Sequence, residues 1–352
     1  MVGASTSVCL PFSATANAAR IAISVPQVRQ SFGLTTNVRQ AFSIARSSFW
    51  MIAKSPPGLF LLAVFPMFVV LVLHVESGMW GIQMLPRTGY ILTKHVTAAL
   101  THFSDYRVIV PLLIVYFAGE LVWRERDARL SENVDATPVP ESVFFLGKFL
   151  GLSLVLAAFM ASLTVAGMVA QTLMGYHDFQ VGLYLQILFG LQLPEYLLFA
   201  VLVLLVHALV NQKHVAMLVA LVVYFCIVFS SVLGIEHDLL VYGAGAEWSY
   251  TDIRGFGASL GPWLWFKLYW AAWALLLMVL SIALWVRGRE LGARRRLRVM
   301  RARFGKGTAL PRAAATQAPE AALELPWHAA LLTGGLAVDR VIEAYQRGGR
   351  VT

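Results

Sequence analysis

Several stretches of the chain are apolar over about the twenty residues that a helix needs to cross the hydrocarbon core of a bilayer. Of its 352 residues, 58% are hydrophobic and 13% are charged, whereas soluble domains carry about 25% charged residues. No large soluble core is therefore expected. The sequence predicts an all-α, polytopic membrane protein.

The apolar runs predict six transmembrane helices within a membrane domain at 55–287. Pro194 and Glu195 interrupt the long run before the fourth helix, so we expect 183–193 to be a re-entrant or interfacial piece and 76–107 to be a mixed loop. The predicted spans are 58–75, 108–123, 143–174, 196–210, 215–233 and 263–286.

The two ends of the chain are polar or basic. Residues 1–35 are rich in Ser, Thr, Ala and Asn and contain no acid, which predicts a disordered arm. Residues 288–352 are predicted to be a basic, largely disordered cytoplasmic tail. In 36–54, apolar residues recur at steps of four and three, which predicts an amphipathic helix. Because a span follows at once, we expect this helix to lie flat in the headgroup layer, with a soluble packing helix as the alternative.

A polar segment, 124–142, separates the second and third predicted spans and holds eight charges from Arg124 to Glu141. Residues 124–134 can form a short helix, which Pro138 and Pro140 would end. This segment is either an ordinary solvated connector or a handle on which a soluble partner could push.

Basic residues are distributed unevenly between the two sides of the six-span arrangement. Counting the tail only to residue 312, twenty Lys and Arg fall on the side of the two termini and the polar segment, against four in the opposite loops. Since basic residues near span ends favour the cytoplasmic side, both termini and the polar segment are predicted to be cytoplasmic.

The sequence lacks the common motifs of a membrane enzyme. It contains no H-E-x-x-H, no G-x-S-x-G, no phosphate-binding loop and no Cys/His cluster at metal spacing. We therefore predict no catalytic residue, metal site or cofactor, and no nucleic-acid partner. A membrane enzyme is the least favoured of three hypotheses for the function of the chain.

Three ionisable residues near or within spans are candidates for function in the membrane. Glu120 lies one helical turn before Arg124 and is expected to pair with it. Glu195 is expected in the first turn of the fourth span, where the helix dipole favours an acid. Lys267 is expected to extend to the outer edge. None of the three has an evident partner at its own depth.

The polar segment contains a sequence motif that is typical of one family. Glu125-Arg126-Asp127, then Ala-Thr137-Pro138-Val-Pro, then Leu-Gly-Lys148 resembles the cytoplasmic segment between the second and third spans of type-2 ATP-binding-cassette (ABC) transporter permeases. In that family the segment forms a coupling helix that docks on an ATPase subunit, and 36–54 resembles the family's elbow helix. The resemblance implies ATPase-coupling roles for Arg124, Glu125, Arg126, Asp127, Arg129, Thr137, Pro138 and Lys148.

A second resemblance concerns the last span and the loop before it. Tyr250-x-Asp252-x-x-Gly-Phe-Gly and Trp265-Phe-Lys267-Leu-Tyr-Trp resemble a subgroup of bacterial permeases, some of which are fused to a zinc aminopeptidase domain. Together the resemblances imply a permease subunit in the bacterial cytoplasmic (inner) membrane. They also imply a separate ABC ATPase and a homodimer or a heterodimer with a second permease half. A non-transporting membrane anchor for a partner complex is the alternative.

Overall fold

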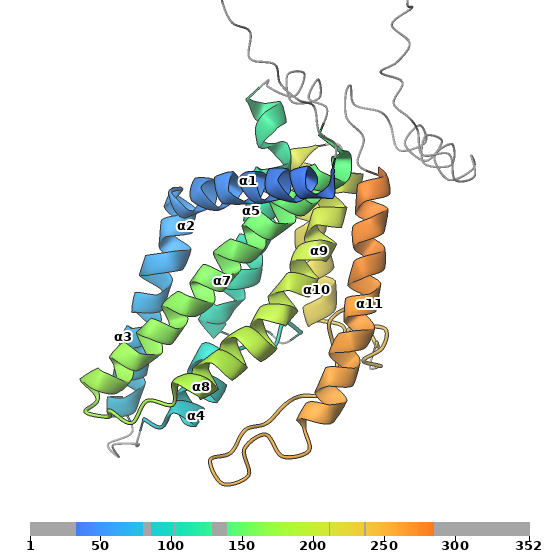
Figure 1. The fold of residues 1–352 in the computed structure, drawn as a ribbon. Helices are drawn as coiled ribbons and strands as arrows, with labels where there is room; N and C mark the ends of the chain where they lie inside the picture. Colours follow the sequence, from blue (N-terminus) through green and yellow to red (C-terminus); the bar gives the residue numbers. More distant parts are fainter. Residues whose placement is uncertain are drawn as a thin grey trace, which may run out of the picture.

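The computed structural model describes residues 33–79, 86–101, 103, 105–128, 139–210, 212–235 and 237–284 (Figure 1). These residues form helices and turns and contain no β-strand beyond one isolated bridge, Thr251 to Gly255. The prediction of an all-α protein is confirmed. The disordered arm predicted at 1–35 is too long by two residues, because a helix begins at Leu34. Residues 1–32 of the arm and the tail at 288–352 lie outside the described residues.

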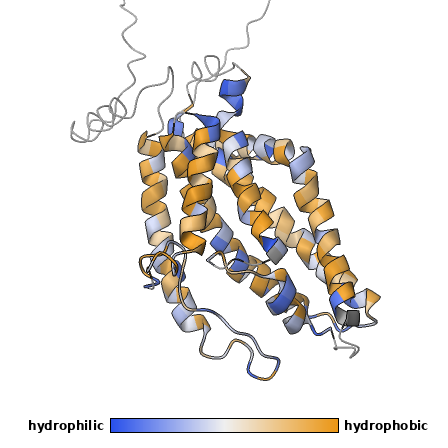
Figure 2. Ribbon diagram, turned by 180° about the vertical axis from the view of Figure 1, so that it is seen from behind, coloured by the Kyte–Doolittle hydropathy of each residue, from blue (hydrophilic) through white to orange (hydrophobic). Residues whose placement is uncertain are grey.

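Five segments in the described part are helices long and apolar enough to cross a membrane. They run between the same two ends of the molecule, with hydrophobic residues along most of their length (Figures 1 and 2). The five are Pro56–Glu76 (α2, Pro56–Leu59; the π-helical η1, Phe60–Val64; and most of α3, Phe65–Met79), Tyr106–Asp127 (η3, Asp105–Val108, and α5, Ile109–Asp127), α7 (Glu141–Leu173), Val181–Leu209, and α11 (Leu260–Leu284).

The predicted fifth span is shorter than expected. Its helix, α10 (Lys213–Val228), has 16 residues and is about 24 Å long, less than the roughly 30 Å of a hydrocarbon core. Residues 229–234 form turns instead of continuing the helix to 233. The polytopic architecture is thus confirmed, with five full-length spans and one short apolar helix in the described residues.

The predicted re-entrant piece at 183–193 is wrong. Val181–Leu209 is one continuous 29-residue helical segment, made of α8 (Val181–Tyr184), the π-helical η4 (Leu185–Gln192) and α9 (Leu193–Leu209). Local π-helical adjustment lets a membrane helix pass through a proline, whose missing N–H would otherwise interrupt it. Glu195 therefore lies fourteen residues from each end of the span, not in its first turn.

The predicted amphipathic helix is α1 (Leu34–Ala53), which lies across one end of the bundle and crosses α7 (Figure 1). Ala45 and Ser48 are buried at this crossing, opposite Gly147 and Gly151. A Cβ atom at Gly151 would lie 2.5 Å from the Cβ of Ser48, so only glycine allows this approach. Small residues four apart let membrane helices pack closely. Tight packing on α7 therefore fixes α1.

The apolar face of α1 is divided between two environments. Ala45 and Ile52 are buried, whereas Val38 and Phe42 remain 67% and 63% exposed. The buried half holds α1 on α7. The exposed half is free to contact the headgroup layer, as the sequence suggested.

The predicted mixed loop at 76–107 contains helical structure at the opposite end of the bundle. α4 (Thr88–Ile91) and the π-helical η2 (Leu92–Val96) are fastened to α7 through the buried side chain of Gln171. Gln171 Nε2 donates to the carbonyl of Pro86 at 2.9 Å and to the hydroxyl of Thr88 at 3.0 Å, and its Oε1 accepts from the Tyr184 hydroxyl at 3.0 Å. These bonds satisfy every donor and acceptor of a polar group that would be costly in the membrane.

The α1–α7 crossing gives a first prediction. Gly151→Val should lower the free energy of unfolding by about 1–3 kcal/mol, because the added side chain overpacks the contact with Ser48. Gly190→Val is the matched control, since Gly190 is also helical and a Cβ there meets nothing within 4 Å. Thermal unfolding of the purified chain in detergent measures both. Equal unfolding temperatures for the two variants would contradict a tight crossing.

Candidate functional site

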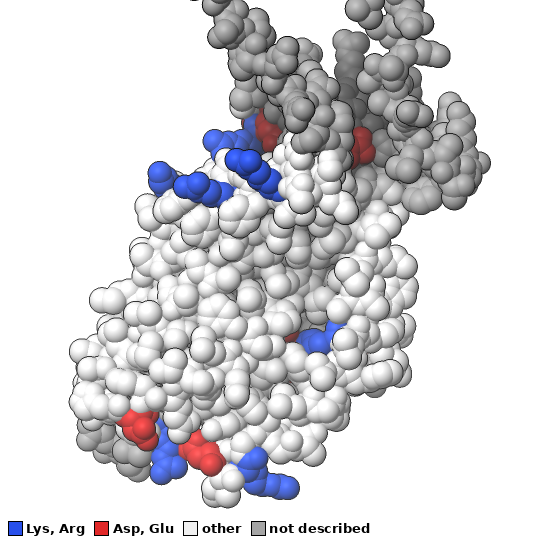
Figure 3. All heavy atoms as spheres, viewed as in Figure 1, with Lys and Arg blue, Asp and Glu red and all other residues white. Residues whose placement is uncertain are grey.

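On the face that Figure 3 shows, charged side chains gather at the two ends of the molecule, and the surface between them carries few charges. One of these charged ends is the end that α1 covers. It contains the C-terminal end of α5 and the N-terminal ends of α7 and α10. We call this set of charged residues the coupling end: Glu120, Arg124, Glu125, Arg126, Asp127, Lys148 and Lys213.

An ion pair joins α5 to α7 at the coupling end. Lys148 Nζ lies 2.8 Å from Glu125 Oε2. The lysine is only 3% exposed, and it lies two turns into α7, whereas Glu125 is partly exposed at the end of α5. Two residues that the family resemblance singled out separately are therefore direct partners.

A second ionic cluster joins α5 to α10. Lys213 Nζ lies 2.8 Å from a carboxylate oxygen of Glu120 and 2.8 Å from one of Asp127. The expected pairing of Glu120 with Arg124 within one helix is thus corrected, because the first residue of α10 brings an ammonium to Glu120 from another helix. One lysine holds two acids that are two helical turns apart on α5.

The two arginines have different surroundings. The Arg126 guanidinium lies 4.8 Å from the ring centre of Trp123, within cation–π range, and the Trp123 indole donates to His207 Nδ1 of α9 at 3.3 Å. Arg124 is exposed. Both lie on the last turns of α5, so the predicted short helix at 124–134 begins as a continuation of the second span. Arg129, Thr137 and Pro138 lie outside the described residues.

The ion pairs of the coupling end connect three helices. In the described part of the chain no group of three or more His, Cys, Asp or Glu residues could hold a metal ion. What the geometry provides is a set of short ionic contacts from one helix, α5, to the N-terminal parts of two others. A force applied to the end of α5 would therefore reach α7 and α10 together.

A further ion pair lies within the bundle, away from either end. Lys267 Nζ lies 2.9 Å from Glu195 Oε1, and the residues are 9% and 8% exposed. Lys267 also donates to the carbonyl of Gly243 at 2.8 Å. The expectations that Lys267 extends to the outer edge and that neither residue has a partner are both wrong. The error follows from placing Glu195 at the start of its span.

Comparison with known protein families now bears on these contacts. Residues 49–230 match the model of the family described as ABC-2 family transporter protein, a range that reaches from the end of α1 past α10 and includes the coupling end. The chain belongs to this family. It is therefore a multi-pass membrane protein and a membrane subunit of an ABC transporter. A comparison with curated proteins found no match.

The family match confirms the first resemblance seen in the sequence, to type-2 ABC permeases. It ends before α11, so the likeness of the last span to permeases fused to an aminopeptidase stays a prediction. The roles of the coupling-end residues also stay predictions. Lys213 and Trp123 were not singled out from the sequence; a lone lysine in a tight turn and an aromatic residue at a span edge carry no signal of their partners.

The Glu125–Lys148 contact gives a second prediction. Glu125→Lys should lower the free energy of unfolding by about 2 kcal/mol, between the values for exposed and buried pairs, because it places two ammonium groups together. The charge-swapped double variant, Glu125→Lys with Lys148→Glu, should recover most of that loss. Thermal unfolding in detergent tests the recovery. A double variant less stable than Glu125→Lys alone would show that the pair does not hold α5 to α7.

The buried pair gives a third prediction. Glu195→Gln should destabilise the protein by about 3–5 kcal/mol, because it leaves the Lys267 ammonium buried without a carboxylate. Glu195→Gln with Lys267→Met should be much closer to the parent chain, since replacing both charges is often nearly neutral. The exposed pair of Arg87 and Asp252, 3.2 Å apart, provides the control: Asp252→Asn should cost no more than about 1 kcal/mol. Equal losses in Glu195→Gln and Asp252→Asn would contradict a desolvated pair.

Proposed function

We propose that this chain receives mechanical work from a separate ATPase subunit at the coupling end and uses it to translocate a substrate. The observation that carries the proposal is the set of ion pairs connecting the end of α5 to α7 and α10. Lys148 with Glu125, and Lys213 with Glu120 and Asp127, connect three helices at the point where the polar segment leaves the bundle.

The continuity of α5 supports transmission over distance. The helix runs without interruption from Ile109 to Asp127, so its last turn cannot tilt without moving the span. α7 begins at Glu141, on the other side of the polar segment, and continues for 33 residues. A partner that displaced the segment between them would move two long helices at once. The ionic contact of Lys213 adds α10 to the moving unit.

The coupling end is proposed to face the cytoplasm of a bacterial cell. Basic residues near span ends favour the cytoplasmic side. The described residues place Arg39, Arg46 and Lys54 of α1 and its C-cap at this end, together with the lysines and arginines of the coupling end. The start of α1 and the end of α11 lie at this end too (Figure 1), which supports both termini being cytoplasmic.

In this family of transporters two ATPase subunits drive one transporter, which implies a dimer of permease halves. One chain offers one coupling end. We therefore propose that the transporter contains two permease halves, either two copies of this chain or this chain with a similar one.

Charge reversal at Arg124 tests the coupling role. Arg124 is exposed at the coupling end, so Arg124→Glu should leave the bundle folded and insert normally, while a reversed charge at the docking surface opposes the partner. We expect about a tenfold loss in the ATPase that co-purifies from native membranes, equivalent to about 1.4 kcal/mol. The measurement is the amount of a subunit with the G-x-x-x-x-G-K-[ST] motif captured per chain, and its rate of ATP hydrolysis.

Arg254→Glu is the matched control, because Arg254 is an exposed arginine two residues after Asp252, which pairs with Arg87 at the opposite end. It should capture the ATPase as the parent chain does. If Arg124→Glu captures as much ATPase, with the same hydrolysis rate, as Arg254→Glu, docking at the coupling end is wrong. Capture without any hydrolysis in the parent chain would instead indicate a membrane anchor.

A further inference from the structure

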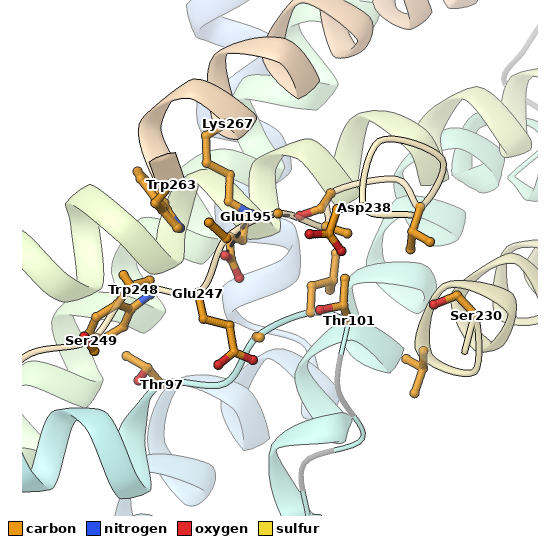
Figure 4. A pocket seen from close by; sticks show the side chains of 18 of the residues that line it. Thr97, Thr101, Glu195, Ser230, Asp238, Glu247, Trp248, Ser249, Trp263 and Lys267 are labelled. Atoms are coloured by element: carbon orange, nitrogen blue, oxygen red, sulfur yellow. Dashed lines mark hydrogen bonds and ion pairs between the residues drawn. The ribbon is translucent and has the colours of Figure 1, made fainter. Parts of the chain in front are cut away.

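A cavity of about 790 Å³ lies beside the buried Glu195–Lys267 pair (Figure 4). Its walls come from α9, α11, the extended segment at 97–101 and the long connection from Val228 to Tyr250. The volume falls within the roughly 300–1,000 Å³ of typical small-molecule sites. None of the coupling-end residues lines the cavity, so the cavity is separate from the coupling end.

Helix α10 ends beside the cavity, since Val228, its last residue, belongs to the lining. Non-helical backbone at membrane depth is tolerated where it lines a cavity, because the free backbone groups then find water or a ligand. The turns that follow Val228 bring Ser230 and Ser231 to the cavity wall. These turns are internally bonded, for example from the amide of Ile235 to the carbonyl of Ser230 at 2.9 Å.

The walls are held in place by hydrogen bonds from the spans. Gln192 Oε1 accepts from the amide of Ala98 at 3.2 Å and its Nε2 donates to the carbonyl of the same residue at 2.9 Å. On the other side, the Trp270 indole donates to the carbonyl of Ala244 at 2.7 Å, and the Tyr242 hydroxyl donates to the carbonyl of Leu198 at 3.0 Å. The cavity is therefore largely pre-formed, which lowers the cost of ordering it on binding.

The charges that line the cavity favour a cation. Glu195, Asp238 and Glu247 surround the same space from different segments, and Lys267 is the one basic residue among the described residues of the lining (Figure 4). Lys267 pairs with the buried Glu195, and Asp238 and Glu247 are exposed. Acids exceed bases by two, so the cavity carries a negative potential that attracts positive ligands.

The aromatic lining adds two features. Trp263 lines the cavity and is 6% exposed, and its indole Nε1 has no hydrogen-bond partner among the described residues. A buried donor without a partner is costly unless a ligand or water accepts from it. Lys267 Nζ lies 5.7 Å from the ring centre of Trp263, so this ring already accommodates one cation, and Trp248 provides a second indole.

We propose that this cavity binds an organic cation that carries an apolar or aromatic body and a hydrogen-bond acceptor. Asp238 and Glu247 attract the charge, the indoles contact the body, and the Trp263 N–H donates to the acceptor. The inference that this cavity holds the transported substrate rests on the function proposed above. The inference that it binds an organic cation does not, so the two proposals can fail separately.

Benzoylcholine is a suitable probe, since it combines a quaternary ammonium, an aromatic ring and an ester carbonyl. Its uncharged isostere, in which a tert-butyl group replaces the trimethylammonium, has the same shape. The full chain, purified in a non-ionic detergent without any ATPase, is titrated with each, and binding is followed by equilibrium dialysis and tryptophan fluorescence. We expect benzoylcholine to bind saturably and at least about tenfold more tightly than the isostere. A difference of this size is expected when one charge of the ligand interacts with partly desolvated carboxylates.

Substitutions of the acids that line the cavity test whether benzoylcholine binds there. Glu247→Gln and Asp238→Asn should each weaken benzoylcholine about five-fold and leave the isostere unchanged, because each removes one attracting charge. Asp252→Asn is the matched control, because Asp252 is an exposed acid of the same connection that pairs with Arg87 and does not line the cavity.

Repeating the titration in nanodiscs of phosphatidylcholine identifies the natural source of the cation. Weaker apparent binding than in detergent would show that a choline headgroup competes and that a lipid supplies the ligand, whereas unchanged binding would indicate a soluble cation. The proposal is overturned if benzoylcholine and its isostere bind alike, or if Glu247→Gln and Asp238→Asn both bind benzoylcholine as Asp252→Asn does. Failure here leaves the test at Arg124 unaffected.

Discussion

Hydrocarbon offers no water to a buried charge, so each ionisable group within or beside a span must find its partner inside the protein. In this chain the partners come from other helices. Lys148 pairs with Glu125 across α7 and α5, Lys213 with Glu120 and Asp127 across α10 and α5, and Lys267 with Glu195 across α11 and α9. The need to satisfy these few charges connects helices that share mostly non-directional apolar contacts.

The two groups of ion pairs have different surroundings and suit different roles. At the coupling end the acids of the pairs are partly exposed, as expected where a soluble partner would dock. The pair between Glu195 and Lys267 is desolvated and faces a cavity with further carboxylates. If both proposals hold, α9 links the two regions, because it carries Glu195 at its start and His207, the partner of Trp123, in its last turn.

Much of the fold could be predicted from the sequence because apolar length is a local property. The third span, expected at 143–174, is Glu141–Leu173 in the structure, and the amphipathic helix expected at 36–54 is Leu34–Ala53. The family resemblance rested on short motifs and is confirmed by the match over 49–230. These features required no knowledge of which helices are neighbours.

What could not be predicted depended on contacts between distant segments. The partner of Glu120 lies 93 positions away at Lys213, and that of Glu195 lies 72 positions away at Lys267. The closeness of α1 to α7 depends on Gly147 and Gly151, which read in the sequence only as part of an apolar entry to the third span. The cavity, built from four separate segments, left no local pattern at all.

The π-helical run from Leu185 to Gln192 has an evolutionary consequence. A π turn holds more residues than an α turn, and each residue of an ordinary helix advances about 100° around the axis. Because the wider turn accommodates an extra residue locally, losing a single codon in this run would return it to an ordinary α-helical turn and keep the two halves of the span in phase. Losing a codon in the α-helical part between this run and Leu209 would instead rotate one half relative to the other by about 100°. Relatives with this architecture should therefore differ in length by one residue more readily within this run than in the α-helical parts of the span.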